Sequence, residues 1–345
     1  MTVRVGVLGA TGAVGQRLVA VLADHDTFEL AALTASDESA GREYGEATTW
    51  RRSTSLPGAV ANEPVRPTDP ESIPDELDLL FSALPSSVAG TIEPALCARG
   101  HVVSSNASNE RMAEDVPLVI PEINPDHLSL LEGQRRHRDW EGGLVKNPNC
   151  STIALALPLA ALEPFGIETV RVATMQAVSG AGFGGVGADE IVDNVLPHIP
   201  GEAEKVETEP RKLLGSRSGD RIEAHSATIS ASCNRVPTLD GHLESVWVET
   251  SAELSVERAL AAFRDLEGCG LASGPDQPIH VFERLDRPQP RLDRDRADGM
   301  AVSVGGVRET PSGLQFTCLV HNTVRGAAGA SVLNGELLLD RGVVG

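Results

Sequence analysis

The chain has 345 residues and a mass of 36.3 kDa, enough for two domains or one large domain with a sizeable core. Asp and Glu outnumber Lys and Arg by 49 to 29, and the net charge of −20 disfavours nucleic acid and anionic membranes as partners. No apolar run is long enough to predict a membrane span, and the N-terminal MTVRVGVLGA lacks the layout of a signal peptide.

Lysine and cysteine usage indicate the setting of the protein. Only Lys146, Lys205 and Lys212 are lysines, against 26 arginines (29 − 3). An acidic chain with so few lysines and 3% aromatic residues suggests a cytoplasmic, halophilic protein; an ordinary acidic enzyme is the alternative. The five cysteines form no CxxC pair and the nine histidines form no HxxxH or HExxH motif, so we expect neither a disulfide framework nor a metal site.

The first half of the chain predicts a Rossmann-like nucleotide-binding fold. An apolar strand at 3–8 leads into GATGAVG (9–15), and an amphipathic helix follows directly. In this position glycines let the backbone approach a pyrophosphate at the positive end of the helix, although a tight turn without a ligand is the alternative. Helical segments separate some of the further strands, which are predicted at 28–36, 77–85, 101–108 and 117–124.

The loop SDESAGR (36–42) bears on the choice of nicotinamide cofactor. Asp37 and Glu38 favour NAD, because acidic side chains hold ribose hydroxyls and repel a 2′-phosphate. The side chains that favour NADP are Ser36, Ser39 and Arg42. The residues alone therefore leave both cofactors open.

Cys150 stands at the predicted start of a long apolar helix, STIALALPLAAL (151–162), behind the charged connector QRRHRDWEGG (134–143). Asn149 is a good N-cap residue, so Cys150 falls in the first turn, where free N–H groups and the helix dipole stabilise negative charge. We therefore expect a lowered pKa and a nucleophilic thiolate; a small buried hydrophobic side chain is the alternative. A thiolate beside a nicotinamide indicates aldehyde or acyl chemistry through a thioester, with an acid or base nearby.

Two later segments offer partners for this thiolate. A turn at PTLDG separates Arg235 from His242, so we expect both at one mouth, with the imidazole for proton transfer and the guanidinium for a substrate carboxylate. Gln176 precedes a glycine-rich loop and would orient the thiolate or the acyl oxygen. Ordinary surface or loop roles are the alternatives for these residues.

The remaining segments predict a helix with paired charges and a C-terminal hairpin and helix. In ETEPRKLL (207–214), Pro210 predicts a helix start, with Glu209 and Lys212 on one face; a plain surface pair is the alternative. MAVSVGGV and LQFTCLVHN flank a P-S-G turn and read as a hairpin. Small residues at the start of the last helix, 324–340, would let it dock against the nucleotide domain.

Together, these motifs resemble the aspartate-β-semialdehyde dehydrogenases of the archaeal and fungal type over essentially the whole chain. The motifs that carry the resemblance are GATGAVG, SNASNERM, NPNCST, QAVSGAG, the E-x-x-K of Glu209–Lys212, CNRVP with DGH, and HNTVRGAAGAS. The expected fold is α/β, with an N-terminal Rossmann-like nucleotide-binding domain (1–149 plus the C-terminal helix 324–345) and an α+β catalytic and dimerisation domain (150–323).

The resemblance also implies residue roles. Cys150 is the expected nucleophile, His242 the acid/base, and Gln176 a positioning residue. Expected contacts to the substrate are Arg235 to its carboxylate, Glu209 to its amino group, and Arg111 and Lys212 to phosphate. The expected cofactor-binding residues are Gly9, Thr11, Gly12, Ala13, Val14, Gly15, Ser36, Ser39, Arg42, Ser82, Ser179, Gly180, Gly182 and Asn322.

The reaction that the resemblance implies is the reversible, NADP-dependent reduction of L-aspartyl-4-phosphate to L-aspartate-4-semialdehyde with release of phosphate, in lysine, threonine and methionine biosynthesis. A homodimer or homotetramer is expected. Glu38 stands where the family often has an arginine, which keeps dual use of NADP and NAD open. The alternatives are a malonyl-CoA-type acyl-CoA reductase, for which Arg111 and Lys212 would be idle, and a nucleotide-sensing protein without catalysis.

Overall fold

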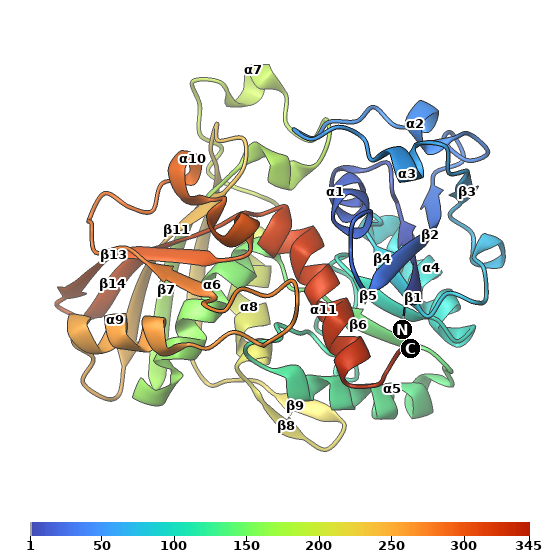
Figure 1. Cartoon of the computed structure of the whole chain (residues 1–345). Coiled ribbons are helices and arrows are strands. Elements are labelled where there is room, and N and C mark those ends of the chain that lie inside the picture. The colour runs from blue at the N-terminus through green and yellow to red at the C-terminus, as the bar shows by residue number, and fades with distance from the viewer. Residues whose placement is uncertain (1) are drawn as a thin grey trace.

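Six parallel strands form the sheet of the N-terminal domain in a computed structural model that describes residues 2–345 (Figure 1). Their order, β3-β2-β1-β4-β5-β6, is that of a doubly wound nucleotide-binding sheet, so the predicted Rossmann-like fold is confirmed. The crevice at the switch point between β1 and β4 opens beside the glycine loop. The strands are β1 (Val3–Leu8), β2 (Phe28–Ala35), β3 (Val65–Pro67), β4 (Leu79–Ser82), β5 (Val102–Ser105) and β6 (Gly143–Lys146).

Helices cover both faces of this sheet. Side chains of α1 (Ala13–Leu22) and α11 (Gly329–Asp340) join one apolar cluster with β1 and β2, while α4 (Ser86–Ala98) packs on the opposite face. The other helices of this domain are α2 (Tyr44–Ala47), α3 (Gly58–Ala61) and α5 (Leu130–Arg138). Within residues 2–345, no helix combines the length and the apolar character that crossing a bilayer requires.

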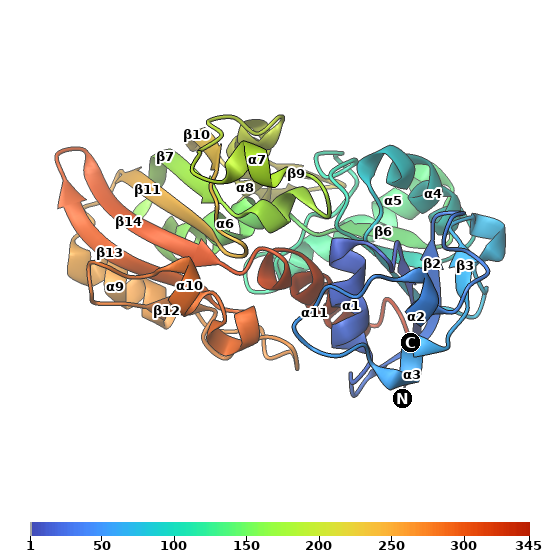
Figure 2. The ribbon, with the colours of Figure 1, turned by 90° about the horizontal axis from the view of Figure 1, so that it is seen from above.

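The second domain is built on a mixed six-stranded sheet, in the order β10-β7-β11-β14-β13-β12 (Figure 2). Its strands are β7 (Ile167–Gln176), β10 (Thr228–Arg235), β11 (His242–Thr250), β12 (Ile279–Val281), β13 (Val302–Thr310) and β14 (Gly313–Val320). Helices α6 (Cys150–Leu162), α8 (Glu202–Leu213) and α9 (Val256–Asp265) pack on one face. Along β11 buried and half-buried residues alternate, so the other face is covered less well.

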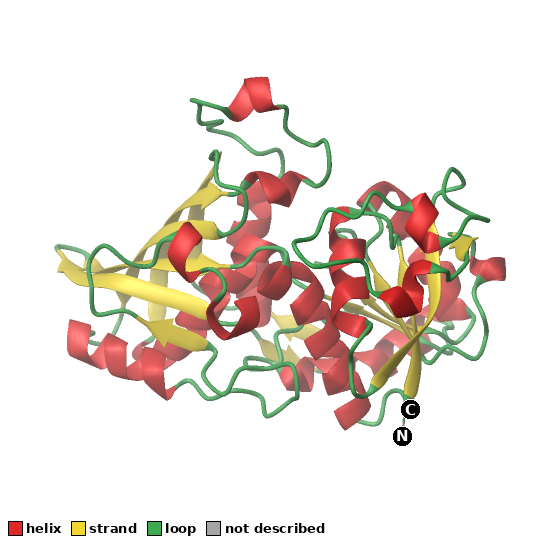
Figure 3. Ribbon diagram, turned by 45° about the horizontal axis from the view of Figure 1, so that its top comes forward, coloured by secondary structure: helices red, strands yellow, loops and turns green. Residues whose placement is uncertain are grey.

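Shorter elements complete the second domain. A small hairpin joins β8 (Ser216–Ser218) to β9 (Arg221–Glu223), and α10 (Pro290–Asp293) precedes β13. The loop that carries α7 (Ala188–Ile191) projects away from the body of the molecule (Figure 3). The predicted hairpin near the C-terminus is confirmed as β13 and β14.

The C-terminal helix returns to the first domain, as expected. It begins with a π-helical turn at Val324–Ala328 and continues as α11. Close packing explains its small residues, because a methyl group on Gly335 would lie 2.7 Å from the Phe81 ring. The Ser331 hydroxyl lies 3.0 Å from that of Ser104, which ties the helix to β5.

Three local predictions were wrong. The segment 117–124 contributes only an isolated bridge, Leu118 to Lys146, because Pro117 and Pro121 lack the N–H groups of a continuous ladder. The stretch 134–143 is not a plain connector, since its first half belongs to α5. Pro210 does not start a helix but lies inside α8, which begins at Glu202.

Candidate active site

Cys150 is the first residue of α6, as the sequence predicts. The Asn149 side chain caps the helix, with its Oδ1 accepting the N–H groups of Ser151 (2.9 Å) and Thr152 (3.3 Å). The π-helical turn closes over this helix end, because a methyl group on Gly326 would lie 2.6 Å from the Cys150 Cβ. Cys150 as a residue is only partly buried.

Gln176, Arg235 and His242 meet at one edge of the second sheet. Arg235, at the end of β10, is in register with Gln176 at the end of β7, and antiparallel β11 begins beside them at His242. The Ala177 backbone joins these two side chains: its N–H donates to His242 Nδ1 (3.0 Å) and its carbonyl accepts from Arg235 Nη1 (2.8 Å). The expected convergence of Arg235 and His242 is confirmed.

Gly180 keeps this edge open. A methyl group there would lie 2.9 Å from Arg235 Nη1 and 3.0 Å from His242 Nε2. Gln176 Oε1 and His242 Nε2 are buried without a hydrogen-bond partner among residues 2–345. Two polar atoms are thus available to a reacting group at this edge.

The His242 imidazole is neutral at physiological pH. Burial lowers its pKa to about 3, and the positive charge of Arg235 adds to this effect. Because Nδ1 accepts the Ala177 N–H, the neutral ring carries its proton on Nε2. His242 therefore presents a hydrogen-bond donor to the site.

The Cys150 thiol is protonated at rest, so the expected lowered pKa is wrong. Burial, the larger cause, and the carboxylate of Glu202 together raise its pKa to about 12. Arg111, the Ser151 N–H and Arg235 act in the opposite direction. The helix end alone does not outweigh the loss of hydration.

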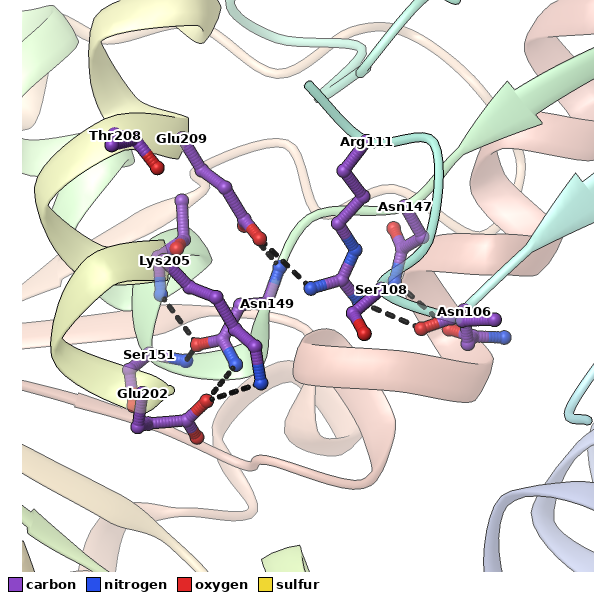
Figure 4. A network of polar contacts seen from close by, with 12 residues as sticks. Asn106, Ser108, Arg111, Asn147, Asn149, Ser151, Glu202, Lys205, Thr208 and Glu209 are labelled. Atoms are coloured by element: carbon purple, nitrogen blue, oxygen red, sulfur yellow. Dashed lines mark hydrogen bonds and ion pairs between the residues drawn. The ribbon is translucent and has the colours of Figure 1, made fainter. Parts of the chain in front are cut away.

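Two carboxylates of α8 hold the residue that precedes Cys150 (Figure 4). Glu209 Oε2 accepts the backbone N–H of Asn149 (2.7 Å), and its Oε1 pairs with Arg111 Nη1 (2.9 Å). Glu202 Oε1 accepts from Asn149 Nδ2 (2.9 Å) and from Lys205 Nζ (3.0 Å). Glu209 and Arg111 therefore lie beside Cys150, as expected.

Lys212 is not available for phosphate, contrary to the expectation. Its ammonium donates to the backbone carbonyls of Arg111 (2.8 Å), Ala113 (2.7 Å) and Val116 (2.7 Å). An ammonium has three N–H donors, and all three are used. Lys212 instead holds the loop that carries Arg111 against α8, and burial lowers its pKa to about 8.

Replacing Lys212 by methionine is therefore expected to destabilise the fold. Two buried carbonyls and one partly buried carbonyl would lose their donor, which costs about 3 kcal/mol or more. Urea unfolding measures this loss, with Glu204→Gln on the exposed side of α8 as the control. A free energy of unfolding within about 0.5 kcal/mol of the parent protein would contradict the assignment.

The glycine loop lines a cavity of about 240 Å³ at the crevice of the first sheet. Gly9 has a φ of +78°, which favours glycine, and a methyl group on Gly15 would lie 2.1 Å from the Gly9 carbonyl oxygen. Ala13 and Val14 are the first residues of α1, so their N–H groups have no partner within the helix and point out of its N-terminal end toward this cavity. The expected cofactor residues that line the cavity are Gly9, Thr11, Gly12 and Ser36.

The other expected cofactor residues are dispersed. Ser39 and Arg42 lie outside this cavity, and the Arg42 guanidinium donates to the Glu46 carbonyl. Ser82 is fully buried at the end of β4. Ser179 and Gly182 line a second cleft of about 550 Å³ between the domains, and Asn322 Nδ2 donates to the Ser179 hydroxyl (2.8 Å).

Comparison with known proteins identifies the family. The family described as semialdehyde dehydrogenase, NAD binding domain, matches residues 4–131, and the semialdehyde dehydrogenase dimerisation domain matches 157–325. The aspartate-semialdehyde dehydrogenase of Archaeoglobus fulgidus is 51% identical over 100% of both chains. The chain belongs to the aspartate-semialdehyde dehydrogenase family.

Solved structures agree with this membership. The aspartate semialdehyde dehydrogenase of Candida albicans with NADP has a TM-score of 0.91 at 39% identity, covering 100% of both chains. Aspartate semialdehyde dehydrogenase II of Vibrio cholerae, complexed with ASA, has a TM-score of 0.78 at 26% identity, covering 99% of both chains. No group of three or more potential metal ligands gathers anywhere in residues 2–345.

Sequence reasoning missed two contributors to this family site. Glu202 lies seven residues before Glu209, two helical turns along the same face, and this spacing was the available signal. The Ala177 backbone, which joins Arg235 to His242, has no sequence signal because any residue supplies the same atoms.

Two buried histidines predict acid sensitivity of the fold. Burial lowers the pKa of His242 to about 3 and that of His321 to about 4. Unfolded histidines bind a proton below about pH 6.5, so stability is full above that pH and falls as the pH decreases toward 4. At pH 5 the loss is about 2 kcal/mol per histidine relative to pH 7.

Urea unfolding at pH 7, 6 and 5 measures this dependence. His242→Gln is expected to remove about 2 kcal/mol of the destabilisation between pH 7 and 5, because one titrating histidine is gone, whereas the buried Glu244, whose pKa is raised, stabilises the fold as the pH falls in both proteins. The same change in the free energy of unfolding between pH 7 and 5 in His242→Gln and in the parent protein would contradict the assignment.

Proposed function

We propose that this protein catalyses the reversible, NADP-dependent reduction of L-aspartyl-4-phosphate to L-aspartate-4-semialdehyde with release of phosphate, in lysine, threonine and methionine biosynthesis. The observation that carries the proposal is the meeting of Gln176, Arg235 and His242 at one sheet edge in a member of this family. The Candida albicans structure with NADP and the Vibrio cholerae structure complexed with ASA support the same cofactor and substrate for this chain.

Arginines would orient the substrate. Arg235 has one donor on the Ala177 carbonyl, and its remaining donors suit a substrate carboxylate. Arg111 pairs with Glu209 and is the remaining cation of the expected phosphate pair, since Lys212 is occupied. Glu209 is proposed to hold the substrate amino group with the lone pairs that Arg111 and Asn149 leave unused.

Cys150 would carry the acyl group. The thiol sulfur attacks the acyl carbon and gives up its proton to the departing phosphate, so that a C–S bond forms, the C–O bond to phosphate breaks, and hydrogen phosphate leaves. NADPH, when bound, supplies the hydride that reduces this thioester. His242 Nε2–H stabilises the oxyanion that then develops, and the C–S bond breaks to release the aldehyde and the thiolate.

The glycine loop fits a dinucleotide. Backbone N–H groups at the start of α1 and the cavity at Gly9, Thr11 and Gly12 suit a pyrophosphate, and a side chain at Gly15 would not fit. Ser36, Ser39 and Arg42 are the proposed contacts to a 2′-phosphate. Glu38 opposes that group, so we propose that NAD is also accepted, with lower affinity than NADP.

Nicotinamide absorbance tests the function. With aspartate semialdehyde as substrate, we expect reduction of NADP that requires phosphate, and slower reduction of NAD. Family membership favours this reading over an acyl-CoA reductase or a nucleotide sensor. A rate that is independent of phosphate and requires coenzyme A would instead support the acyl-CoA reductase.

We also propose a homodimer or homotetramer assembled through the less covered face of the second sheet. Leu243 and Trp247 of β11 and Met175 of β7 are half-buried there, and the matching family domain is described as a dimerisation domain. Light scattering would report the oligomer, and Trp247→Glu is expected to yield monomers.

We also propose that the protein is a cytoplasmic, salt-adapted enzyme. The five free cysteines and the charge of −20 support this proposal, and measuring activity at rising KCl concentrations tests it.

A further inference from the structure

We propose that Glu202 is a positioning residue for the reacting sulfur and acts through the side chain of Asn149. The inference rests on the proposed role of Cys150 as nucleophile. Glu202 is buried and lies on the face of α8 that meets the start of α6 (Figure 4).

Asn149 is held at both its backbone and its side chain. Glu209 Oε2 accepts its backbone N–H (2.7 Å), while Glu202 Oε1 accepts from its side-chain Nδ2 (2.9 Å). The helix cap itself is made by Oδ1, which accepts from Ser151 and Thr152. Glu202 thus pairs with the Asn149 amide nitrogen, which takes no part in the helix cap.

This contact selects one orientation of the amide. An ionised carboxylate is an acceptor only, so it pairs with Nδ2 and would repel Oδ1. Turning the amide over would place two oxygens together and would also point Nδ2 at the helix N–H groups. Lys205 Nζ, 3.0 Å from the same Glu202 oxygen, is a second donor to this carboxylate. Glu202 therefore fixes the cap, and the cap fixes the first turn that carries Cys150.

Several charged groups face Cys150 from different elements. Glu202 of α8 raises its pKa, whereas Arg111, in the loop after β5, and Arg235 of β10 lower it. On the other elements against α6, burial raises the pKa of Glu244 of β11, and Arg325 of the π-helical turn pairs with Glu122. Glu202 is thus the negative charge that opposes ionisation of the thiol.

The two effects of Glu202 can be separated by a pair of variants. Glu202→Gln keeps an oxygen that accepts from Asn149 Nδ2 but removes the charge, whereas Glu202→Ala removes both. Alkylation of Cys150 by iodoacetamide, followed by peptide mass spectrometry between pH 6 and 9, reads the thiolate fraction. We expect alkylation at pH 7 to be about three- to tenfold faster in Glu202→Gln than in the parent protein, and unchanged in the Glu204→Gln control.

The turnover number, kcat, measures how well Glu202 positions Cys150 through Asn149. We expect kcat to fall about 10- to 100-fold in Glu202→Ala and to stay within about threefold of the parent in Glu202→Gln, because the latter keeps the contact to Asn149. In an Asn149→Ala background, Glu202→Ala is expected to change kcat by less than about twofold, since the residue through which it acts is gone.

Two results would overturn the inference: a kcat of Glu202→Ala equal to that of the parent protein, or a loss of kcat of the same size with and without Asn149.

Failure of the proposed function would give different results. If alkylation of Cys150 leaves the aldehyde activity intact, the nucleophile assignment fails, and the role of Glu202 as a positioning residue for catalysis fails with it. If alkylation abolishes activity while the Glu202 variants match the parent protein, only the inference about Glu202 fails.

Discussion

Replacing Cys150 by serine is expected to lower kcat by about 10⁴-fold or more while leaving NADP affinity within about threefold. The variant keeps the volume and the helix cap, because Asn149 and its partners are untouched. A serine hydroxyl is both a weaker acid and a weaker nucleophile than the Cys150 thiol, and the neutral His242, whose proton is on Nε2, cannot take the hydroxyl proton at that atom. Acyl transfer should therefore stop.

Steady-state assays with aspartate semialdehyde and phosphate measure the loss, and NADPH fluorescence titration measures cofactor binding. Cys233→Ser is the matched control, since that thiol is buried in β10 and has no role in the proposed chemistry. Phosphate-dependent turnover in Cys150→Ser at more than about 1% of the parent rate would contradict a thioester mechanism.

Replacing His242 by leucine is expected to lower kcat by about 10²- to 10⁴-fold. The variant removes the Nε2–H donor and leaves the Ala177 N–H without its acceptor. His242→Gln should retain about tenfold more activity than His242→Leu, because a glutamine amide can place an N–H near the former Nε2.

The pH profile separates a donor from a titrating base. Because burial lowers the pKa of His242 to about 3, kcat/KM should show no decline with a midpoint near 6.5. An acidic limb near 6.5 in the parent protein that disappears in His242→Gln would show instead that the imidazole titrates during catalysis.

Local signals predicted the geometry around Cys150. An N-cap residue before a long apolar run is a short-range pattern, and Asn149 forms the cap as expected. The turn between Arg235 and His242 is also encoded locally, and it brings the two side chains to one sheet edge. The βαβ order predicted the first sheet for the same reason.

The predictions that were wrong concern properties that depend largely on contacts between residues far apart in the sequence. The pKa of Cys150 depends on Glu202, 52 positions further along the chain (202 − 150), and on burial by segments that no local pattern reveals. The carbonyls that occupy Lys212 lie about 100 residues away in sequence. Pro210 resembled a helix start because proline is favoured there, although α8 tolerates it two turns in.

The placement of the lysines has a practical consequence for anyone attaching the protein to a surface. Lys146 is fully buried against Glu93, and Lys212 is only 5% exposed, whereas the Lys205 side chain is 33% exposed. Among the lysines of the folded chain, Lys205 should therefore react first with amine-directed reagents such as succinimidyl esters. Lys205 is also the ion-pair partner of Glu202. Immobilisation through the abundant carboxylates would leave that lysine unmodified.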